Sequence, residues 1–170
     1  ARGEYVIFVD SDDWVPQDCL EKLITPMAKN NVQMVVGGIE IRDFAIRKEI
    51  IEEKHLDLQE TEYNKVREFF IERSALSRGP YAKLYDRRII YENDIKFNES
   101  IKWGEDAIFL YEYWKYARKI YFIKDIVYYY NRLVLTASTR KICENKVFCR
   151  ITLQRKFEEL INTISLENKE

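Results

Sequence analysis

The stretch EYVIFVDSDDW, residues 4–14, joins an apolar run directly to a group of carboxylates. Residues 5–9 favour a strand and are mostly apolar on both faces, as in an interior strand of a parallel sheet. Asp10, Asp12 and Asp13 follow at once. Carboxylates this close repel one another, so we expect a positively charged group among them. The stretch therefore predicts a buried strand that ends in an acidic loop, where α/β sheets commonly bind ligands.

The segment after the loop has the pattern of an α/β unit. PQDCLEKLITPMAKNN, residues 16–31, predicts a helix with Pro16 in its first turn. Pro26 is expected to kink this helix or to end it early. VQMVVGG, residues 32–38, predicts a second buried strand. A strand, a loop, a helix and a strand in this order favour an α/β fold with a right-handed crossover.

The central part of the chain carries shorter patterns of both kinds. IEIRDF and AIRKEII, residues 39–51, alternate apolar and charged residues, which predicts a half-exposed hairpin. Residues 62–76 and 104–119 have helical periodicity, and KLYDRRIIYEN, residues 83–93, predicts a short helix. KIYFI and DIVYYYN, within residues 119–131, predict two short strands.

The C-terminal segment, from about residue 142 to residue 166, predicts one amphipathic helix. Its apolar stripe consists of Phe157, Leu160, Ile161 and Ile164. Docking of this stripe onto the rest of the domain is the simpler interpretation, and attachment to a membrane surface or a partner is the alternative. We therefore expect a domain over residues 1–140 and a helix over residues 141–170.

Composition excludes several classes of function. The chain has 170 residues, and its 28 Lys and Arg nearly balance 29 Asp and Glu, whereas a general nucleic-acid binder carries a basic surplus. Cys19, Cys143 and Cys149 lack CxxC spacing and His55 is the only histidine, so neither a zinc site nor a Cys/His or Ser/His/Asp nucleophile is expected. No apolar run reaches the ~18 residues of a membrane span and no signal peptide is visible, so we expect a cytoplasmic protein with reduced thiols.

The acidic loop favours a hard divalent cation. Asp10, Ser11 and Asp12 form a D-x-D motif, with Asp13 as a third oxygen donor. Mg²⁺ and Mn²⁺ prefer such donors and keep positions open for a diphosphate. Capping of the following helix is the structural alternative. An EF-hand calcium loop lacks its glycine here, and a haloacid-dehalogenase-type phosphatase expects Thr or Val soon after the second Asp, where Asp13 and Trp14 stand.

A second acidic motif lies in IKWGEDAIFLYEYW, residues 101–114. Gly104 gives a flexible entry, and Glu105 and Asp106 open a helix, so helix capping would explain this motif on its own. Both motifs together suit an inverting sugar transfer. A metal stabilises the leaving diphosphate while a separate carboxylate takes the proton of the acceptor hydroxyl, and Trp103 is suited to stack on a sugar ring.

Two ordered blocks of sequence resemble family-2 glycosyltransferases with the GT-A fold. ARGEYVIFVDSDDWVPQDCLEKL is similar to the segment around their D-x-D motif. PYAKLYDRRIIYENDIKFNESIKWGEDAIFLYEYWKYARKIYFIKDIVYYYNR is similar to their acceptor-side half, with K-L-Y-[DR]-R, F-x-E/D and G-E-D-x-x-F segments. A closing Y-x-Y-x-R pattern with Ser or Thr beyond it is matched by Tyr128, Tyr130, Arg132, Ser138 and Thr139.

The resemblance covers roughly residues 1–140 and implies a fold and a set of roles. The implied fold is α/β, a partial GT-A (Rossmann-like) domain with a mixed sheet and a C-terminal helical segment. Asp10 and Asp12 match the D-x-D that binds Mn²⁺ or Mg²⁺ and the donor diphosphate, and Asp13 is the alternative direct metal ligand. Asp106 matches the catalytic base.

Four further residues receive roles by the same match. Glu105 stands beside the base, Trp103 and Lys83 are implied at the acceptor site, and Arg132 is implied at the donor diphosphate. The implied activity is inverting transfer from a nucleotide-diphosphate sugar, such as a UDP-sugar, to a saccharide or lipid-linked acceptor. Family membership would place it in bacterial cell-surface polysaccharide biosynthesis, in the cytoplasm or at the inner face of the membrane as a peripheral protein.

One departure from the family pattern is large. The N-terminal half of the family carries a V-I-I-P-x-Y-N type strand and a D-D-G-S-T-D type loop that form most of the nucleotide pocket, and nothing similar is present here. We therefore expect the chain to be a C-terminal portion of such an enzyme that does not bind donor properly alone. A non-catalytic, truncated relative that binds a glycan or a partner is the alternative.

Overall fold

The structure is a computed structural model that describes residues 2–42, 46–49, 54–57, 79–101, 103–131 and 146–167. The chain forms two compact units, and each is described by itself. The first comprises Ala1–Leu56, Tyr81–Arg87 and Lys119–Ser138; the second comprises Asp57–Pro80, Arg88–Arg118 and Thr139–Glu170. The helix predicted over residues 62–76 and the boundary predicted at residue 140 lie outside the described residues, so both stay predictions.

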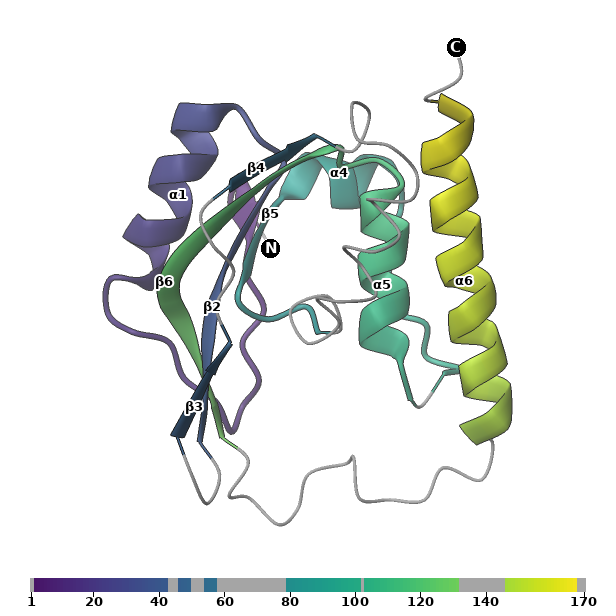
Figure 1. Cartoon of the computed structure of the whole chain (residues 1–170), viewed down its shortest axis with the longest axis horizontal. Coiled ribbons are helices and arrows are strands. Elements are labelled where there is room, and N and C mark those ends of the chain that lie inside the picture. The colour runs from purple at the N-terminus through teal and green to yellow at the C-terminus, as the bar shows by residue number, and fades with distance from the viewer. Residues whose placement is uncertain are drawn as a thin grey trace. The chain divides into compact units, whose positions relative to one another are not determined.

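The first unit is built on one mixed sheet (Figure 1). Its strands are β1 (Tyr5–Val6), β2 (Met34–Arg42), β3 (Ile46–Glu49), β4 (Lys54–Asp57), β5 (Lys83–Asp86) and β6 (Lys119–Asn131). In the described residues the order is β1-β5-β2-β6-β4, and β3 pairs with β2. β2 is parallel to β6 and antiparallel to β3 and β5. The predicted mixed sheet is confirmed, and so is the hairpin, which β2 and β3 form.

Helix α1 (Cys19–Asn30) follows the acidic loop and packs against β2 and β6. Its buried face consists of Cys19, Leu23 and Met27. The predicted early end at Pro26 is wrong, because the helix continues for another turn and the Asn30 side-chain amide donates a hydrogen bond to the Pro26 carbonyl (2.9 Å). Asn31 then ends the helix with φ 48°, a left-handed conformation that Asn adopts more readily than most residues.

Strand β1 differs from the prediction of an interior parallel strand over residues 5–9. It contains two residues, stands at the end of the strand order and runs antiparallel to β5. The apolar run still contributes to the core, because the Phe8 ring packs edge-on against Tyr85 with centroids 5.5 Å apart. The apolar pattern therefore indicates that these residues contact the core, and it does not show that they pair in a strand.

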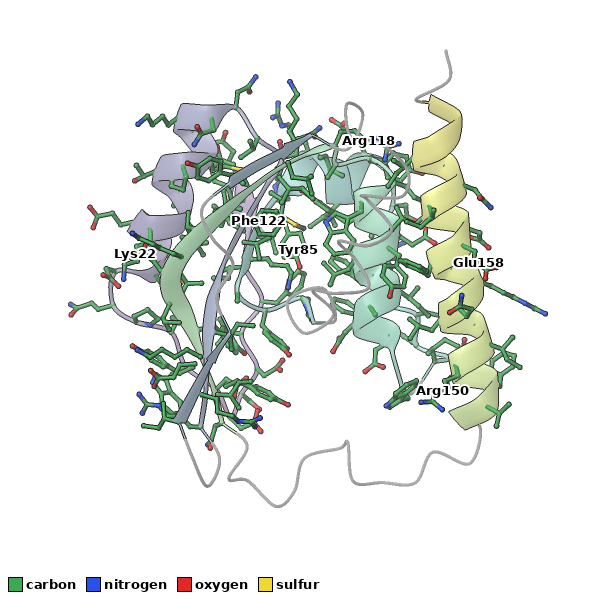
Figure 2. The ribbon with its side chains drawn as sticks, in the orientation of Figure 1. Lys22, Tyr85, Arg118, Phe122, Arg150 and Glu158 are labelled. Carbon is green, nitrogen blue, oxygen red and sulfur yellow. The ribbon has the colours of Figure 1, made fainter. Side chains whose placement is uncertain are left out.

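Two further predictions are corrected in β5 and β6. KLYD forms a buried strand, and only Arg87–Glu92 is helical, as α4. KIYFI and DIVYYYN form one continuous strand, although the exposed pair Lys124 and Asp125 resembles a break. The register between β2 and β6 shifts on both sides of Gly38, and the extra residues lie in β6. Figure 2 shows Tyr85 and Phe122, both buried, among the strands of this sheet.

The second unit contains α5 (Glu105–Trp114) and α6 (Lys146–Glu167), which lie side by side and contact each other (Figure 1). Leu160, Ile161 and Ile164 of α6 are buried, as the docking interpretation predicts. α5 ends before the predicted residue 119, because the chain turns after Trp114 and enters β6. No helix in the described ranges is long and apolar enough to cross a membrane.

Ion pairs join α5 to α6 at the surface of this unit. Lys156 lies 3.1 Å from Glu112 and 2.8 Å from Glu159, and Lys115 lies 2.9 Å and 3.4 Å from the same two carboxylates. The charged residues of α6 change from basic to acidic along the helix, from Arg150 near its start to Glu158 further along (Figure 2).

Candidate functional site

The acidic loop follows β1 in the first unit and contains a tight turn. The backbone N–H of Asp13 donates to the carbonyl of Asp10 at 3.1 Å. The side chains of Asp10 and Asp12 are exposed, whereas Asp13 is half-buried. Helix α1 begins only at Cys19, after an N-cap at Asp18 that makes no side-chain capping bond. The capping alternative for the D-x-D carboxylates is therefore wrong.

A buried tyrosine of β6 ties both ends of this turn to the sheet. The Tyr128 hydroxyl donates to Oδ2 of Asp13 at 2.7 Å and accepts the backbone N–H of Asp10 at 3.0 Å. The backbone N–H of Asn131 donates to the other oxygen of Asp13, also at 2.7 Å. Charge-assisted hydrogen bonds of this length are among the stronger polar contacts in proteins. The loop therefore has a defined position on the C-terminal end of β6.

Trp14 attaches the far side of the loop to the same strand. Its backbone forms an isolated antiparallel bridge with Tyr129, with N···O distances of 3.3 and 2.9 Å. The two rings stack with centroids 5.5 Å apart, and the guanidinium of Arg42 lies 4.8 Å from the Trp14 ring and 4.7 Å from the Tyr129 ring. Such cation–π contacts are worth about 0.5–1 kcal/mol when partly exposed.

The loop concentrates negative charge. Partial removal from water raises the pKa of Asp10, although its side chain stays largely exposed, and the carboxylates of Asp13 and Asp12 raise it further. Burial also raises the pKa of Asp13, although the hydrogen bonds from Asn131 and Tyr128 act in the opposite direction. Within the described ranges, no Lys or Arg forms an ion pair with these carboxylates. A cation would relieve their mutual repulsion.

The donor set suits one kind of metal site and not another. Among the described residues, no three His, Cys, Asp or Glu side chains are placed to hold a metal together. Mg²⁺ is typically held by one or two carboxylates, with water and substrate phosphates as its other ligands. Asp10 and Asp12 fit a site of one or two carboxylates, because both side chains are exposed and both carry negative charge in the same loop.

The second predicted motif lies at the start of α5, in the second unit. Gly104 is the N-cap with φ 87°, a left-handed conformation that favours glycine, and α5 has no side-chain capping bond. Glu105 and Asp106 occupy the first helical turn, where negative side chains are favoured by the helix dipole. Both are only partly buried, as is Trp103 just before them.

Residues of helix α6 pack against this motif. Ile101, Ile108 and Cys149 form a buried cluster, and Trp103 and Leu153 pack against it. Leu153 also lies next to Gly104, since a Cβ built on that glycine would be 3.5 Å from a Leu153 methyl group. The sequence patterns do not predict this role of α6, because Gly104 and Leu153 are about fifty positions apart.

The remaining candidates are placed as follows. Lys83 is buried in β5, donates a hydrogen bond to the Tyr81 carbonyl at 3.1 Å and lies 5.7 Å from the Tyr81 ring. Its acceptor role stays a prediction. Arg132 lies outside the described residues. The structure thus brings Asp10, Asp12 and Asp13 together in one unit and places Trp103, Glu105 and Asp106 in the other.

Sequence reasoning missed the residues that hold the acidic loop. The Y-x-Y pattern singled out Tyr128 but gave it no role, and Trp14, Arg42 and Tyr129 were not connected to one another. The available signal was a cluster of tyrosines at the end of a predicted strand. Only the register of the sheet shows which hydroxyl reaches the loop.

The fold is that of a crystallised glycosyltransferase. TarS 1–349 of S. aureus, solved in complex with UDP-GlcNAc, superposes with a TM-score of 0.73 at 19% identity over 99% of this chain and 48% of that chain. A second TarS structure gives a TM-score of 0.61 over 96% of this chain and 29% of that chain. The predicted α/β class and partial GT-A architecture are confirmed.

The sequence comparisons define the family. A family model described as Glycosyl transferase family 2 matches residues 1–93, more than half of the chain. The chain belongs to glycosyl transferase family 2, as the two sequence blocks predicted. The matched residues include the acidic loop, and the Glu105–Asp106 motif follows them.

Two curated relatives are named as poly(ribitol-phosphate) glycosyltransferases. The poly(ribitol-phosphate) beta-glucosyltransferase of Bacillus spizizenii is 29% identical over 131 residues, which are 76% of this chain and 19% of that protein. The poly(ribitol-phosphate) beta-N-acetylglucosaminyltransferase TarP of Staphylococcus aureus is 28% identical over 76% of this chain and 37% of its own length. The chain thus spans less than half of each relative.

Proposed function

We propose that the protein is an inverting, metal-dependent glycosyltransferase that moves a sugar from a nucleotide-diphosphate sugar to a hydroxyl of a cell-wall polymer. The observation that carries the proposal is the acidic loop, fixed on β6 in a chain of glycosyl transferase family 2. A UDP-sugar is the donor that fits best, because TarS was crystallised with UDP-GlcNAc. A polyol-phosphate polymer or a lipid-linked saccharide is the corresponding acceptor.

The acidic loop serves the donor in this mechanism. Asp10 and Asp12 would hold Mn²⁺ or Mg²⁺, which supplies electrostatic stabilisation to the charge of the leaving diphosphate when bound. The contacts of Tyr128 and Asn131 fix the loop before the donor arrives. Preorganised contacts matter because a mispositioned reacting group lowers the rate steeply.

The second motif serves the acceptor. The Asp106 carboxylate takes the proton from the acceptor hydroxyl while the acceptor oxygen bonds to the anomeric carbon. The bond between that carbon and the diphosphate oxygen breaks on the opposite face, so the configuration inverts and the diphosphate leaves as the anion. Gly104 and the packing of α6 hold Asp106 in the first turn of α5. The catalytic role of Glu105 and the acceptor roles of Trp103 and Lys83 stay predictions.

The test measures UDP release from UDP-GlcNAc and UDP-glucose by an enzyme in which this chain is joined to the N-terminal half of the family, with a poly(ribitol-phosphate) acceptor and Mn²⁺. Asp106→Asn should lower the rate at least about 100-fold, the scale of general acid–base catalysis. Asp12→Asn should lower it by about 100-fold or more, the scale for loss of electrostatic stabilisation of a developing charge. Asp94→Asn is the matched control. The Asp94 side chain is exposed, and its backbone φ of 49° is one that Asn also tolerates. Rates near wild type for both site variants would refute the proposal.

A non-catalytic relative that binds a glycan or a partner is the alternative, and the same samples separate the two. Saturable binding of the acceptor polymer without any UDP release would favour it. The predicted location in the cytoplasm or at the inner membrane face stays a prediction.

A further inference from the structure

The three carboxylates of the acidic loop are not equivalent. Asp13 accepts two hydrogen bonds of 2.7 Å, one on each oxygen, from the Tyr128 hydroxyl and the Asn131 backbone. The carboxylates of Asp10 and Asp12 accept no hydrogen bond from any residue in the described ranges. Asp13 is also half-buried, whereas the other two are exposed.

We propose that Asp13 is a positioning residue that fixes the acidic loop to β6 through Tyr128 and Asn131, and that Asp10 and Asp12 are the carboxylates that contact the metal-bound diphosphate. The second part rests on the proposed function. The first part rests only on the contacts of the loop.

Tyr128 is a rigid point of attachment. Its side chain is fully buried (0% exposed) in β6, and its ring stacks on Tyr81 with centroids 5.0 Å apart. The hydroxyl has one proton, which it gives to Asp13, and it accepts the N–H of Asp10 with a lone pair. One buried group therefore joins the first and the last acid of the loop.

Asp13 also lies between two attachments of the backbone. Residue 14 begins the bridge to Tyr129, and the Asp13 N–H closes the turn onto the Asp10 carbonyl. A metal bound by Asp13 would have to share either Oδ1 with the Asn131 N–H or Oδ2 with Tyr128. Binding by Asp10 and Asp12 disturbs neither bond.

A positioning role and a ligand role predict opposite behaviour of Tyr128→Phe. This variant leaves all three carboxylates in place and removes only the hydroxyl. If Asp13 positions the loop, Tyr128→Phe resembles Asp13→Ala, because both break the same connection. If Asp13 is a ligand, Asp13→Ala resembles Asp12→Ala, and Tyr128→Phe keeps the metal.

The experiment uses this chain labelled with ¹⁵N, titrated with Mn²⁺ alone and then with Mn²⁺ plus UDP. Paramagnetic broadening of the amide signals of residues 10–14 gives the apparent affinity for Mn²⁺. Hydrogen exchange of the Asp10 and Asn131 amides is measured in the same samples without metal. Asp13→Asn, which keeps an acceptor for Asn131, replaces Asp13→Ala if that variant loses its dispersed spectrum.

The proposal expects three results. Asp12→Ala loses the site-specific broadening. Asp13→Ala and Tyr128→Phe each weaken Mn²⁺ binding about tenfold, the scale for residues that orient a metal ligand, and the double variant loses less than the two single losses combined, because both share the Tyr128–Asp13 bond. Exchange of the Asn131 amide accelerates about tenfold or more in Asp13→Ala, and that of the Asp10 amide accelerates in Tyr128→Phe.

Two results would overturn it. Complete loss of broadening in Asp13→Ala, with wild-type affinity in Tyr128→Phe, would make Asp13 a direct ligand. Unchanged exchange of both amides in both variants would show that the hydrogen bonds do not hold the loop. Absence of broadening in the wild type would count against the metal site of the proposed function, and the exchange rates would still decide the positioning role.

Discussion

Replacement of Tyr128 by Phe should cost about 2 kcal/mol of unfolding free energy. The hydroxyl donates to a carboxylate and accepts a backbone N–H. A hydrogen bond to a charged group contributes about 1.5–3 kcal/mol, and one between neutral groups about 0.5–1.5 kcal/mol. The sum is reduced because Asp10 is exposed and Asp13 is only half-buried, so water can replace part of what is lost.

Tyr129→Phe is the matched control on the next residue of β6. The Tyr129 hydroxyl makes no hydrogen bond with a described residue, and its ring would keep the stack with Trp14. We expect a change within about 0.5 kcal/mol, as for most substitutions away from specific contacts. Urea unfolding followed by far-UV circular dichroism measures both variants, with unchanged m-values as the check on two-state behaviour. Equal stability of the two variants would refute the proposed attachment of the loop.

Three further predictions concern the framework around the two motifs. Gly37→Ala should lower the unfolding free energy by about 1–3 kcal/mol, because the new Cβ would lie 2.3 Å from Val127 Cγ2. The loss should be smaller in a Val127→Ala background, and additive losses in urea unfolding would contradict this. Gly104→Ala should cost about 1–2 kcal/mol, since φ is 87° and the nearest contact of the new methyl group is an ordinary 3.5 Å; an unchanged thermal midpoint would be the contrary result. Glu159→Gln should cost about 0.5 kcal/mol at pH 7, since the hydrogen bond from Lys156 lowers the pKa of this half-exposed carboxyl. A group with a lowered pKa stabilises the fold above its unfolded value of 4.5 and loses that contribution as the pH falls further, so wild type and variant should converge at pH 3; a difference of the same size at both pH values would be evidence against the ion pair.

The sequence predicts element types well where one period dominates. The face of α1 formed by Cys19, Leu23 and Met27 repeats every four residues, and the helix is found there. The predictions fail where pairing with a distant strand decides whether a segment becomes a helix or a strand. KLYD could be buried as a helix or as a strand, and it becomes a strand because β1 and β2 hydrogen-bond to its two edges. A local pattern carries no information about such distant partners.

The same limit applies to the candidate site. The D-x-D and G-E-D motifs are contiguous in sequence, so the acidic residues themselves are visible. The residues that hold these motifs in place are not visible in the sequence. Tyr128 is 118 positions from Asp10, and Leu153 lies on another helix from Gly104. Motifs thus locate the chemical groups, and only the packed structure shows what fixes their positions.

The proposed function requires the acidic loop to hold a nucleoside diphosphate through a divalent cation. The most direct measurement is a calorimetric titration of UDP, with Mn²⁺ and separately with EDTA, into an enzyme in which this chain is joined to the N-terminal half of the family. We expect binding that requires Mn²⁺, that disappears in Asp12→Ala and that persists in Asp94→Asn. Binding of UDP that is equal in EDTA, or unaffected by Asp12→Ala, would contradict it.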